Sequence, residues 1–138
     1  MNRGVFYPHG IFGVTVDGRI LVMRTRGPWS KDFVDMYCLT VAMEAASLEG
    51  APWGLLATIS DEGMHTPDSF LAMQAQVAEQ RKQGRCATAL IFDHLNEERA
   101  VREMFKRMYQ AVGEPHAFFT HEPSARQWLL KEIARAAA

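Results

Sequence analysis

Stretches with helical periodicity alternate with short apolar runs along most of this chain, and this alternation limits the folds open to it. Apolar residues recur at intervals of three and four in the periodic stretches, as in helices that bury one face. The apolar runs between them are bounded by Gly, Pro, Asp and Asn, as buried strands are. Strands separated by helices need crossover connections, which favour parallel pairing. The pattern therefore predicts the α/β fold class.

The N-terminal part of the chain predicts an antiparallel hairpin ahead of the first helix. Residues 9–16 alternate in hydropathy, Asp17-Gly18 form a two-residue turn, and residues 19–26 return as an apolar strand. The complete order is then ββαβαβαβα, with about five strands in one mixed, mostly parallel sheet and about four helices around it. We expect one domain over residues 1–138, because no linker or low-complexity tract interrupts the pattern.

Capping residues mark where the predicted helices begin and end. A side-chain oxygen at the N-cap accepts from a free helix amide, and glycine tolerates the left-handed backbone that ends a helix. The predicted N-caps are Ser30, Thr66 and Asn96, the predicted stops are Gly50, Gly84 and Gly113, and Pro123 begins the last helix. The predicted strands between these helices are 54–59, 86–92 and 116–120.

Composition excludes several classes of protein. The chain has 138 residues, a net charge of −1 and 22% charged residues, so no electrostatic attraction to nucleic acid is expected. No apolar stretch approaches the length of a membrane span, and no signal-peptide core follows Met1, so a cytoplasmic location is expected. Cys38 and Cys86 lie in apolar segments and are expected to be reduced and buried. Most of the eight methionines are expected in the core.

Three loops follow predicted strands and would share one edge of a parallel sheet, where ligands of α/β proteins gather. They are 60–66, 93–96 and 120–123. The first is the longest and most polar, and with the helix start behind it supplies the candidate binding or phosphorylation residues. These candidates are Ser60, Asp61, His65, Thr66 and Ser69.

The same residues allow alternatives that the sequence leaves open. Turn formation and helix capping explain them without any chemistry. A serine nucleophile with His65 and Asp61 is a further alternative, but no G-x-S-x-G elbow is present to aim a serine for attack. No metal site and no cofactor are predicted, because His116 and His121 flank a strand end and no Cys pair stands at ligand spacing.

The order of elements and the chain length resemble the STAS domain, the anti-sigma-factor antagonist fold, in its bacterial single-domain branch, which also resembles the CRAL-TRIO lipid-binding fold. The resemblance covers residues 10–135, and its most suggestive local match is the strand, acidic turn and helix start at 118–129. In STAS regulators a serine at the start of the second core helix is phosphorylated. Thr66-Pro67-Asp68-Ser69 is the matching segment, without the second Ser and the Gly of the family motif.

The resemblance implies a non-enzymatic regulatory or protein-interaction domain that binds a protein partner or a small ligand through residues 60–69. A carrier of a small apolar or lipid-like ligand, held between the sheet and the methionine-bearing helices, is the second hypothesis. An enzyme that uses the loop Ser60–Thr66 is the third. A homodimer is also open, because two-fold dimers are the commonest soluble assembly.

Overall fold

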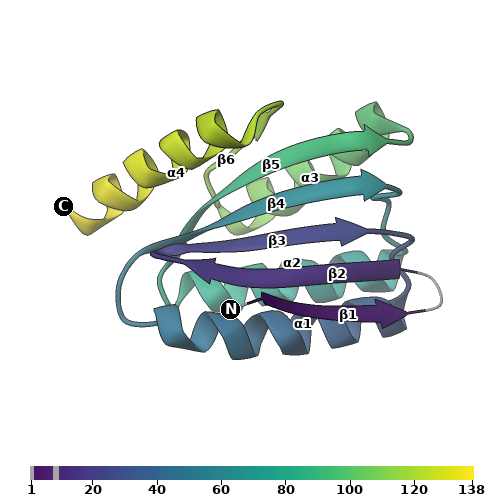
Figure 1. The fold of residues 1–138 in the computed structure, drawn as a ribbon, viewed down its shortest axis with the longest axis horizontal. Helices are drawn as coiled ribbons and strands as arrows, with labels where there is room; N and C mark the ends of the chain where they lie inside the picture. The colour runs from purple at the N-terminus through teal and green to yellow at the C-terminus, as the bar shows by residue number, and fades with distance from the viewer. Residues whose placement is uncertain (1, 8–9) are drawn as a thin grey trace.

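A computed structural model describes the backbone of residues 2–7 and 10–138, and the side chains from residue 10 onward. In this part of the chain the strands form one sheet in the order β1-β2-β3-β4-β5-β6 (Figure 1). The strands are β1 (Asn2–Tyr7), β2 (Gly10–Asp17), β3 (Ile20–Arg26), β4 (Trp53–Asp61), β5 (Arg85–Leu95) and β6 (His116–Phe119). The helices are α1 (Lys31–Ala45), α2 (Pro67–Arg81), α3 (Glu98–Val112) and α4 (Glu122–Ala137), and a 3₁₀ turn at Ala46–Leu48 extends α1.

The predicted α/β class and element order are confirmed. β2 and β3 form the expected hairpin, and β3, β4, β5 and β6 pair in parallel. Asp17 is the last residue of β2 and pairs with Ile20, so the two turn residues are Gly18-Arg19 and the predicted Asp17-Gly18 turn is wrong by one residue. The structure adds one strand that the sequence analysis did not anticipate, because β1 pairs with β2 in antiparallel register ahead of the hairpin. Six residues before the hairpin are too few to show a convincing alternation in hydropathy.

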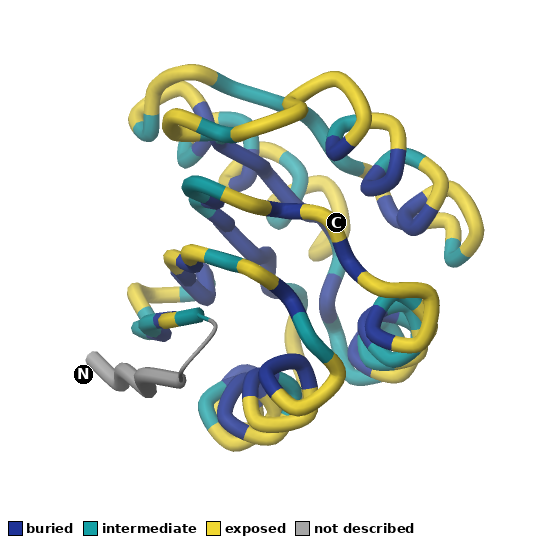
Figure 2. Tube along the Cα trace, turned by 90° about the vertical axis from the view of Figure 1, so that its right-hand side faces the viewer, coloured by how far each residue is buried: buried dark blue, intermediate teal, exposed yellow. Residues whose placement is uncertain are grey.

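The helices cover the two faces of the sheet unequally. α1, α2 and α3 lie side by side on one face, whereas α4 lies alone on the other (Figures 1 and 2). Each of the first three helices links two neighbouring parallel strands, and successive crossovers of one hand that advance in one direction place their helices on one face. α4 follows the last strand and turns back across β5 and β4. The part of this sheet face that β2 and β3 form therefore stays uncovered.

Two apolar cores hold these layers together. The larger core joins alternate residues of the strands to α1, α2 and α3, and the smaller joins the opposite residues to α4. Trp29 and Trp53 are both buried in the larger core. Met73, Met104 and Met108 are buried as expected. The core prediction is wrong for Met36 and Met43, because both lie on the outer side of α1.

The helix starts test the capping predictions directly. Ser30 and Thr66 each accept a hydrogen bond from an amide of the first turn, as predicted. The prediction that Asn96 caps the third helix is wrong, because β5 continues to Leu95 and the Asn96 amide donates to the Asp61 carbonyl at 2.8 Å. Glu97, with a left-handed backbone (φ 52°), precedes the first residue of α3 instead.

Both cysteines are free thiols, as predicted. They are half-buried rather than fully buried, and burial raises the pKa of Cys38 to about 11. Both thiols are therefore protonated at neutral pH and poorly nucleophilic. None of the helices in the described part of the chain combines the length and hydropathy needed to cross a bilayer.

Candidate functional site

The three segments predicted as loops lie at the carboxyl ends of parallel strands, but residues 60–61 and 93–95 belong to β4 and β5 rather than to loops. Asp61 at the end of β4 is paired with Leu95 at the end of β5, so the segments 60–66 and 93–96 lie side by side. β6 ends at Phe119, which is paired with Ile91, whereas β5 continues to Leu95. Residues 120–123 therefore follow the same, carboxyl end of the strands but begin about four residues short of the end of β5. The structure thus places the loops as the parallel arrangement predicts.

Ser60 and Asp61 lie at one end of this edge, in the last residues of β4 rather than in a loop. The Asp61 carboxylate forms an ion pair with Arg26 on the neighbouring strand at 3.2 Å. Asp61 has a left-handed backbone (φ 62°), which turns the chain out of the sheet. Within residues 10–138, no hydrogen bond or ion pair joins Ser60 or Asp61 to the other three candidates.

His65, Thr66 and Ser69 come together at the start of α2. The Ser69 hydroxyl lies 3.2 Å from His65 Nδ1 and 3.0 Å from the Thr66 carbonyl oxygen. Thr66 Oγ1 accepts from the Ser69 amide at 3.4 Å and donates to the Asp68 carboxylate at 2.5 Å. This bond to Thr66 is the main reason that the pKa of Asp68 is lowered. The cluster satisfies polar groups at the first turn of the helix.

His65 is enclosed by aromatic and sulfur-containing side chains. Its ring lies against Trp29, with centroids 4.6 Å apart, and meets the edge of Phe105 at 5.9 Å, while its backbone amide contacts Met104 Sδ at 3.4 Å. Burial in this apolar surrounding lowers the pKa of His65 to about 3, so the imidazole is neutral at physiological pH. The Nε2 atom is buried and has no hydrogen-bond partner among the described residues.

The geometry around Ser69 does not resemble that of an activated nucleophile. Ser69 has no exposed surface, and its hydroxyl is shared among the groups that cap α2. A catalytic imidazole needs a group that orients its second nitrogen, and no such group contacts His65 Nε2 in residues 10–138. Thr66 is exposed and is the more accessible hydroxyl for modification.

An open groove of about 380 Å³ lies beside this cluster, between the start of α2 and α3. Its lining is mainly apolar and consists of Met64, His65, Pro67, Phe70, Leu71, Met104 and Arg107. Met64 and Leu71 are 41% and 62% exposed, which is high for large apolar side chains. In the described chain Arg107 forms no ion pair. No local sequence pattern predicts this groove, because Met104 and Arg107 belong to a helix more than thirty residues away from Leu71.

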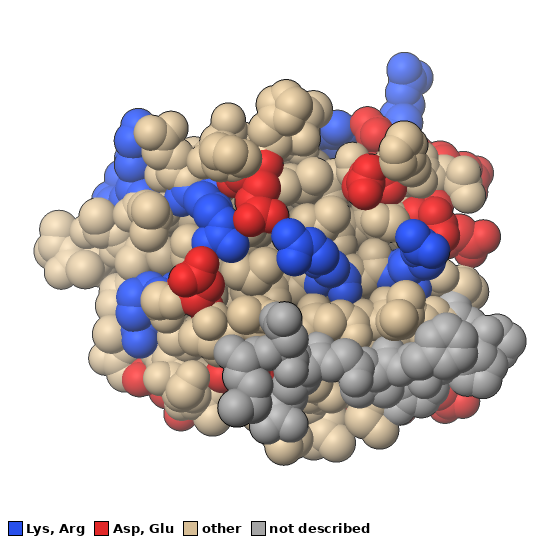
Figure 3. Space-filling model, in the orientation of Figure 1, with Lys and Arg blue, Asp and Glu red and all other residues tan. Residues whose placement is uncertain are grey.

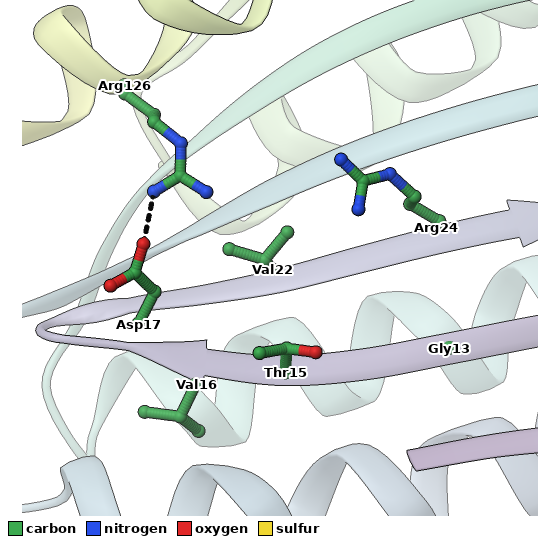
Figure 4. A pocket seen from close by; sticks show the side chains of 7 residues that line it. All are labelled: Gly13, Thr15, Val16, Asp17, Val22, Arg24 and Arg126. Atoms are coloured by element: carbon green, nitrogen blue, oxygen red, sulfur yellow. Dashed lines mark hydrogen bonds and ion pairs between the residues drawn. The ribbon is translucent and has the colours of Figure 1, made fainter. Parts of the chain in front are cut away.

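A second hollow, of about 490 Å³, lies on the opposite face of the sheet where α4 leaves β2 and β3 uncovered (Figure 4). It is lined by Gly13, Thr15, Val16, Asp17, Val22, Arg24 and Arg126. Basic and acidic side chains alternate across this face of the molecule (Figure 3). Hydrogen bonds to Glu122 and Asp17 raise the pKa of Arg126, although it is fully charged in any case.

A buried ionic network lies at the other end of the strands. Arg85 Nε donates to Glu114 at 2.8 Å, and the remaining Arg85 nitrogens donate to Gln80 and Thr88 at 2.8 and 2.7 Å. Thr88 also bonds to Glu114, which accepts a further bond from Arg81 at 3.2 Å. Each nitrogen of Arg85 donates to an acceptor, so the network links α2, β5 and the turn before β6 as a structural unit.

No three His, Cys, Asp or Glu side chains within the described residues come close enough together to hold a metal ion. His116 contacts the Glu114 carbonyl and Tyr109, whereas His94 is almost fully exposed beside Asp93. The chain matches no family model, no curated protein and no solved structure in the comparisons made. Its function must therefore be argued from the geometry of its own sites.

Proposed function

We propose that this chain is a non-enzymatic, STAS-like regulatory domain that binds a protein partner through the groove beside the start of α2. The observation that carries the proposal is the apolar lining of that groove together with the exposure of Met64 and Leu71 at its rim. Exposed apolar side chains that flank a concave surface are typical of protein-interaction sites. Arg107 stands in the lining with no acidic partner in the described chain, which favours a carboxylate on the segment that binds.

The groove supports a peptide segment better than it supports a carried lipid. The enclosed space between the sheet and α1, α2 and α3 measures about 10 Å³, room for one water molecule. A carrier needs an interior large enough to enclose an acyl chain, whereas the groove is open along its length. A helix that presents apolar residues at successive turns, with one acidic residue for Arg107, is complementary to the apolar lining and the charge of the groove.

The neutral, buried His65 supports a binding role over the enzyme hypothesis. Its ring forms one wall of the groove and its Nδ1 holds Ser69, so the imidazole stiffens the surface that the partner contacts. Thr66 lies next to the groove with an exposed side chain. A phosphate added there would place about two negative charges beside Asp68 and would change the electrostatics of the groove.

Peptides selected from a displayed library on the purified protein test the proposal. Affinity of the selected peptides is measured by fluorescence anisotropy for the unmodified protein and for Leu71→Glu, which places a charge at the groove rim. Leu130→Glu is the matched control, because Leu130 is 55% exposed on α4, across the sheet. We expect Leu71→Glu to weaken binding at least tenfold and Leu130→Glu to leave it unchanged. Equal affinity of all three proteins, or failure to select any peptide, would exclude the groove as the recognition site.

A further inference from the structure

In the hollow on the α4 face, the Glu122 carboxylate lies between two arginine side chains. One oxygen of the Glu122 carboxylate accepts from Arg24 at 2.8 Å, and the other accepts from Arg126 Nε at 2.9 Å. The two guanidinium groups reach over the hollow from opposite sides, one from β3 and one from α4, and face each other above Val22 (Figure 4). The pair therefore acts as a clamp with its anion position between the two side chains.

The clamp keeps hydrogen-bond donors that Glu122 does not use. Nη1 of Arg126 donates a hydrogen bond to the Asp17 carboxylate at 2.7 Å, and this bond fixes the direction of the guanidinium. Nη2 of Arg126, and Nε and Nη1 of Arg24, have no acceptor within the described residues. Two or more donors are thus left to a ligand that enters from solvent, and neither guanidinium can lose its charge near neutral pH.

Glu122 is held only loosely in this position. Its side chain is 33% exposed and that of Arg24 is 64% exposed, so water weakens the attraction between them. Ion pairs of such exposure contribute little to stability. A soluble anion with a higher charge than a carboxylate can therefore displace Glu122 at small cost, and the glutamate can swing into solvent from the first turn of α4.

We propose that this hollow is a binding site for a small phosphate monoester, with Glu122 as a built-in competitor for the anion position. A phosphate monoester carries three terminal oxygens and about two negative charges, so it can accept more than one hydrogen bond from the two guanidiniums together, whereas the carboxylate offers one oxygen to each and carries a single charge. Beneath the clamp lie Gly13 and the side chains of Thr15 and Val22, which leave room for the ester group. The volume of about 490 Å³ lies in the range of small-molecule sites. This inference is independent of the peptide groove, which lies on the other face of the sheet.

Phenyl phosphate is a suitable probe, and its binding is followed by NMR chemical-shift titration of the full chain. We expect saturable shifts at residues of β2, β3 and the start of α4. Glu122→Gln removes the competing charge and is expected to tighten binding about two- to thirtyfold, because Glu122 forms two surface ion pairs and each is worth about 1.4- to 5-fold. Arg24→Gln removes one side of the clamp and is expected to weaken binding at least tenfold. Arg99→Gln, at an exposed arginine of α3 on the opposite face, is the control and should bind as the unmodified protein does.

Two competition experiments distinguish the contribution of the phosphate group from that of the apolar group of the ligand. Inorganic phosphate should compete with phenyl phosphate but bind more weakly, because it lacks the apolar group, and benzyl alcohol should not compete. The circular dichroism spectrum and the melting temperature of each variant show whether it is folded. The proposal is overturned if folded Glu122→Gln binds phenyl phosphate no better than the unmodified protein. It is also overturned if Arg24→Gln binds as well as Arg99→Gln does, or if no shifts appear in these strands at millimolar ligand.

Discussion

His65 should make the fold less stable as the pH falls from 8 to 5. Its pKa is about 3 in the folded protein, because the ring is buried between Trp29 and Phe105, whereas a histidine in an unfolded chain has a pKa of about 6.5. Below pH 6.5 the unfolded chain therefore binds a proton that the folded protein does not bind. Stability rises with pH wherever the unfolded state holds more protons, so this contribution is complete above pH 6.5 and is lost as the pH falls toward 3.

The magnitude at pH 5 follows from the unfolded pKa alone, because the folded imidazole stays neutral there. A pH about 1.5 units below the unfolded pKa corresponds to about 2 kcal/mol, since each unit is worth about 1.4 kcal/mol. Domains of this size unfold with a free energy of about 5–15 kcal/mol, so a change of this size is easily measured. Urea unfolding at pH 8 and pH 5, followed by tryptophan fluorescence, gives the free energy of unfolding at each pH.

The comparison with His65→Gln isolates this effect from all other titrating groups. The unmodified protein should lose about 2 kcal/mol more than the variant between pH 8 and pH 5. His94→Gln is the control, because the His94 side chain is 94% exposed, and it should show the pH dependence of the unmodified protein. If the unmodified protein and His65→Gln lose the same free energy over this range, the burial of a neutral imidazole at this position is refuted.

Two further predictions concern stability. Glu114→Gln leaves the buried charge of Arg85 without its carboxylate and should lower the free energy of unfolding by about 3 kcal/mol or more, as measured by urea unfolding at pH 7. A loss below about 1 kcal/mol would mean that water reaches the network. Gly84→Ala should lower the melting temperature much more than Gly113→Ala does, because a Cβ at Gly84 would lie 2.5 Å from the Ala51 carbonyl oxygen, whereas Gly113 has nothing within 4 Å. Similar melting temperatures for the two variants, measured by circular dichroism, would contradict this account of the close approach.

Local signals in the sequence predicted the parts of the fold that local forces determine. The hairpin and the helix starts at Ser30 and Thr66 depend on residues within one or two turns of each other, and all three are confirmed, although the hairpin turn lies one residue later than predicted. Asn96 failed as a predicted cap because its amide pairs with the Asp61 carbonyl on the neighbouring strand. A contact between residues thirty-five positions apart leaves no trace in the local pattern.

The same distinction explains what could be predicted of the candidate sites. Thr66 and Ser69 could be singled out together because both stand in the first turn of α2. The groove could not be predicted, because it exists only where Leu71 of α2 lies beside Met104 of α3. The ion pair between Arg85 and Glu114 could not be predicted either, because in the sequence each is an ordinary charged residue near the end of a helix or strand.

The buried network of Arg85 and Glu114 lies at the amino ends of the parallel strands, and the His65 cluster lies near their carboxyl ends. The buried ion pair thus lies toward the opposite end of the strands from the groove that we propose as a binding surface. One end can stay fixed as an anchor while residues such as Met64 and Leu71 diversify at the other. A fold divided in this way can acquire new binding preferences without risking its own assembly.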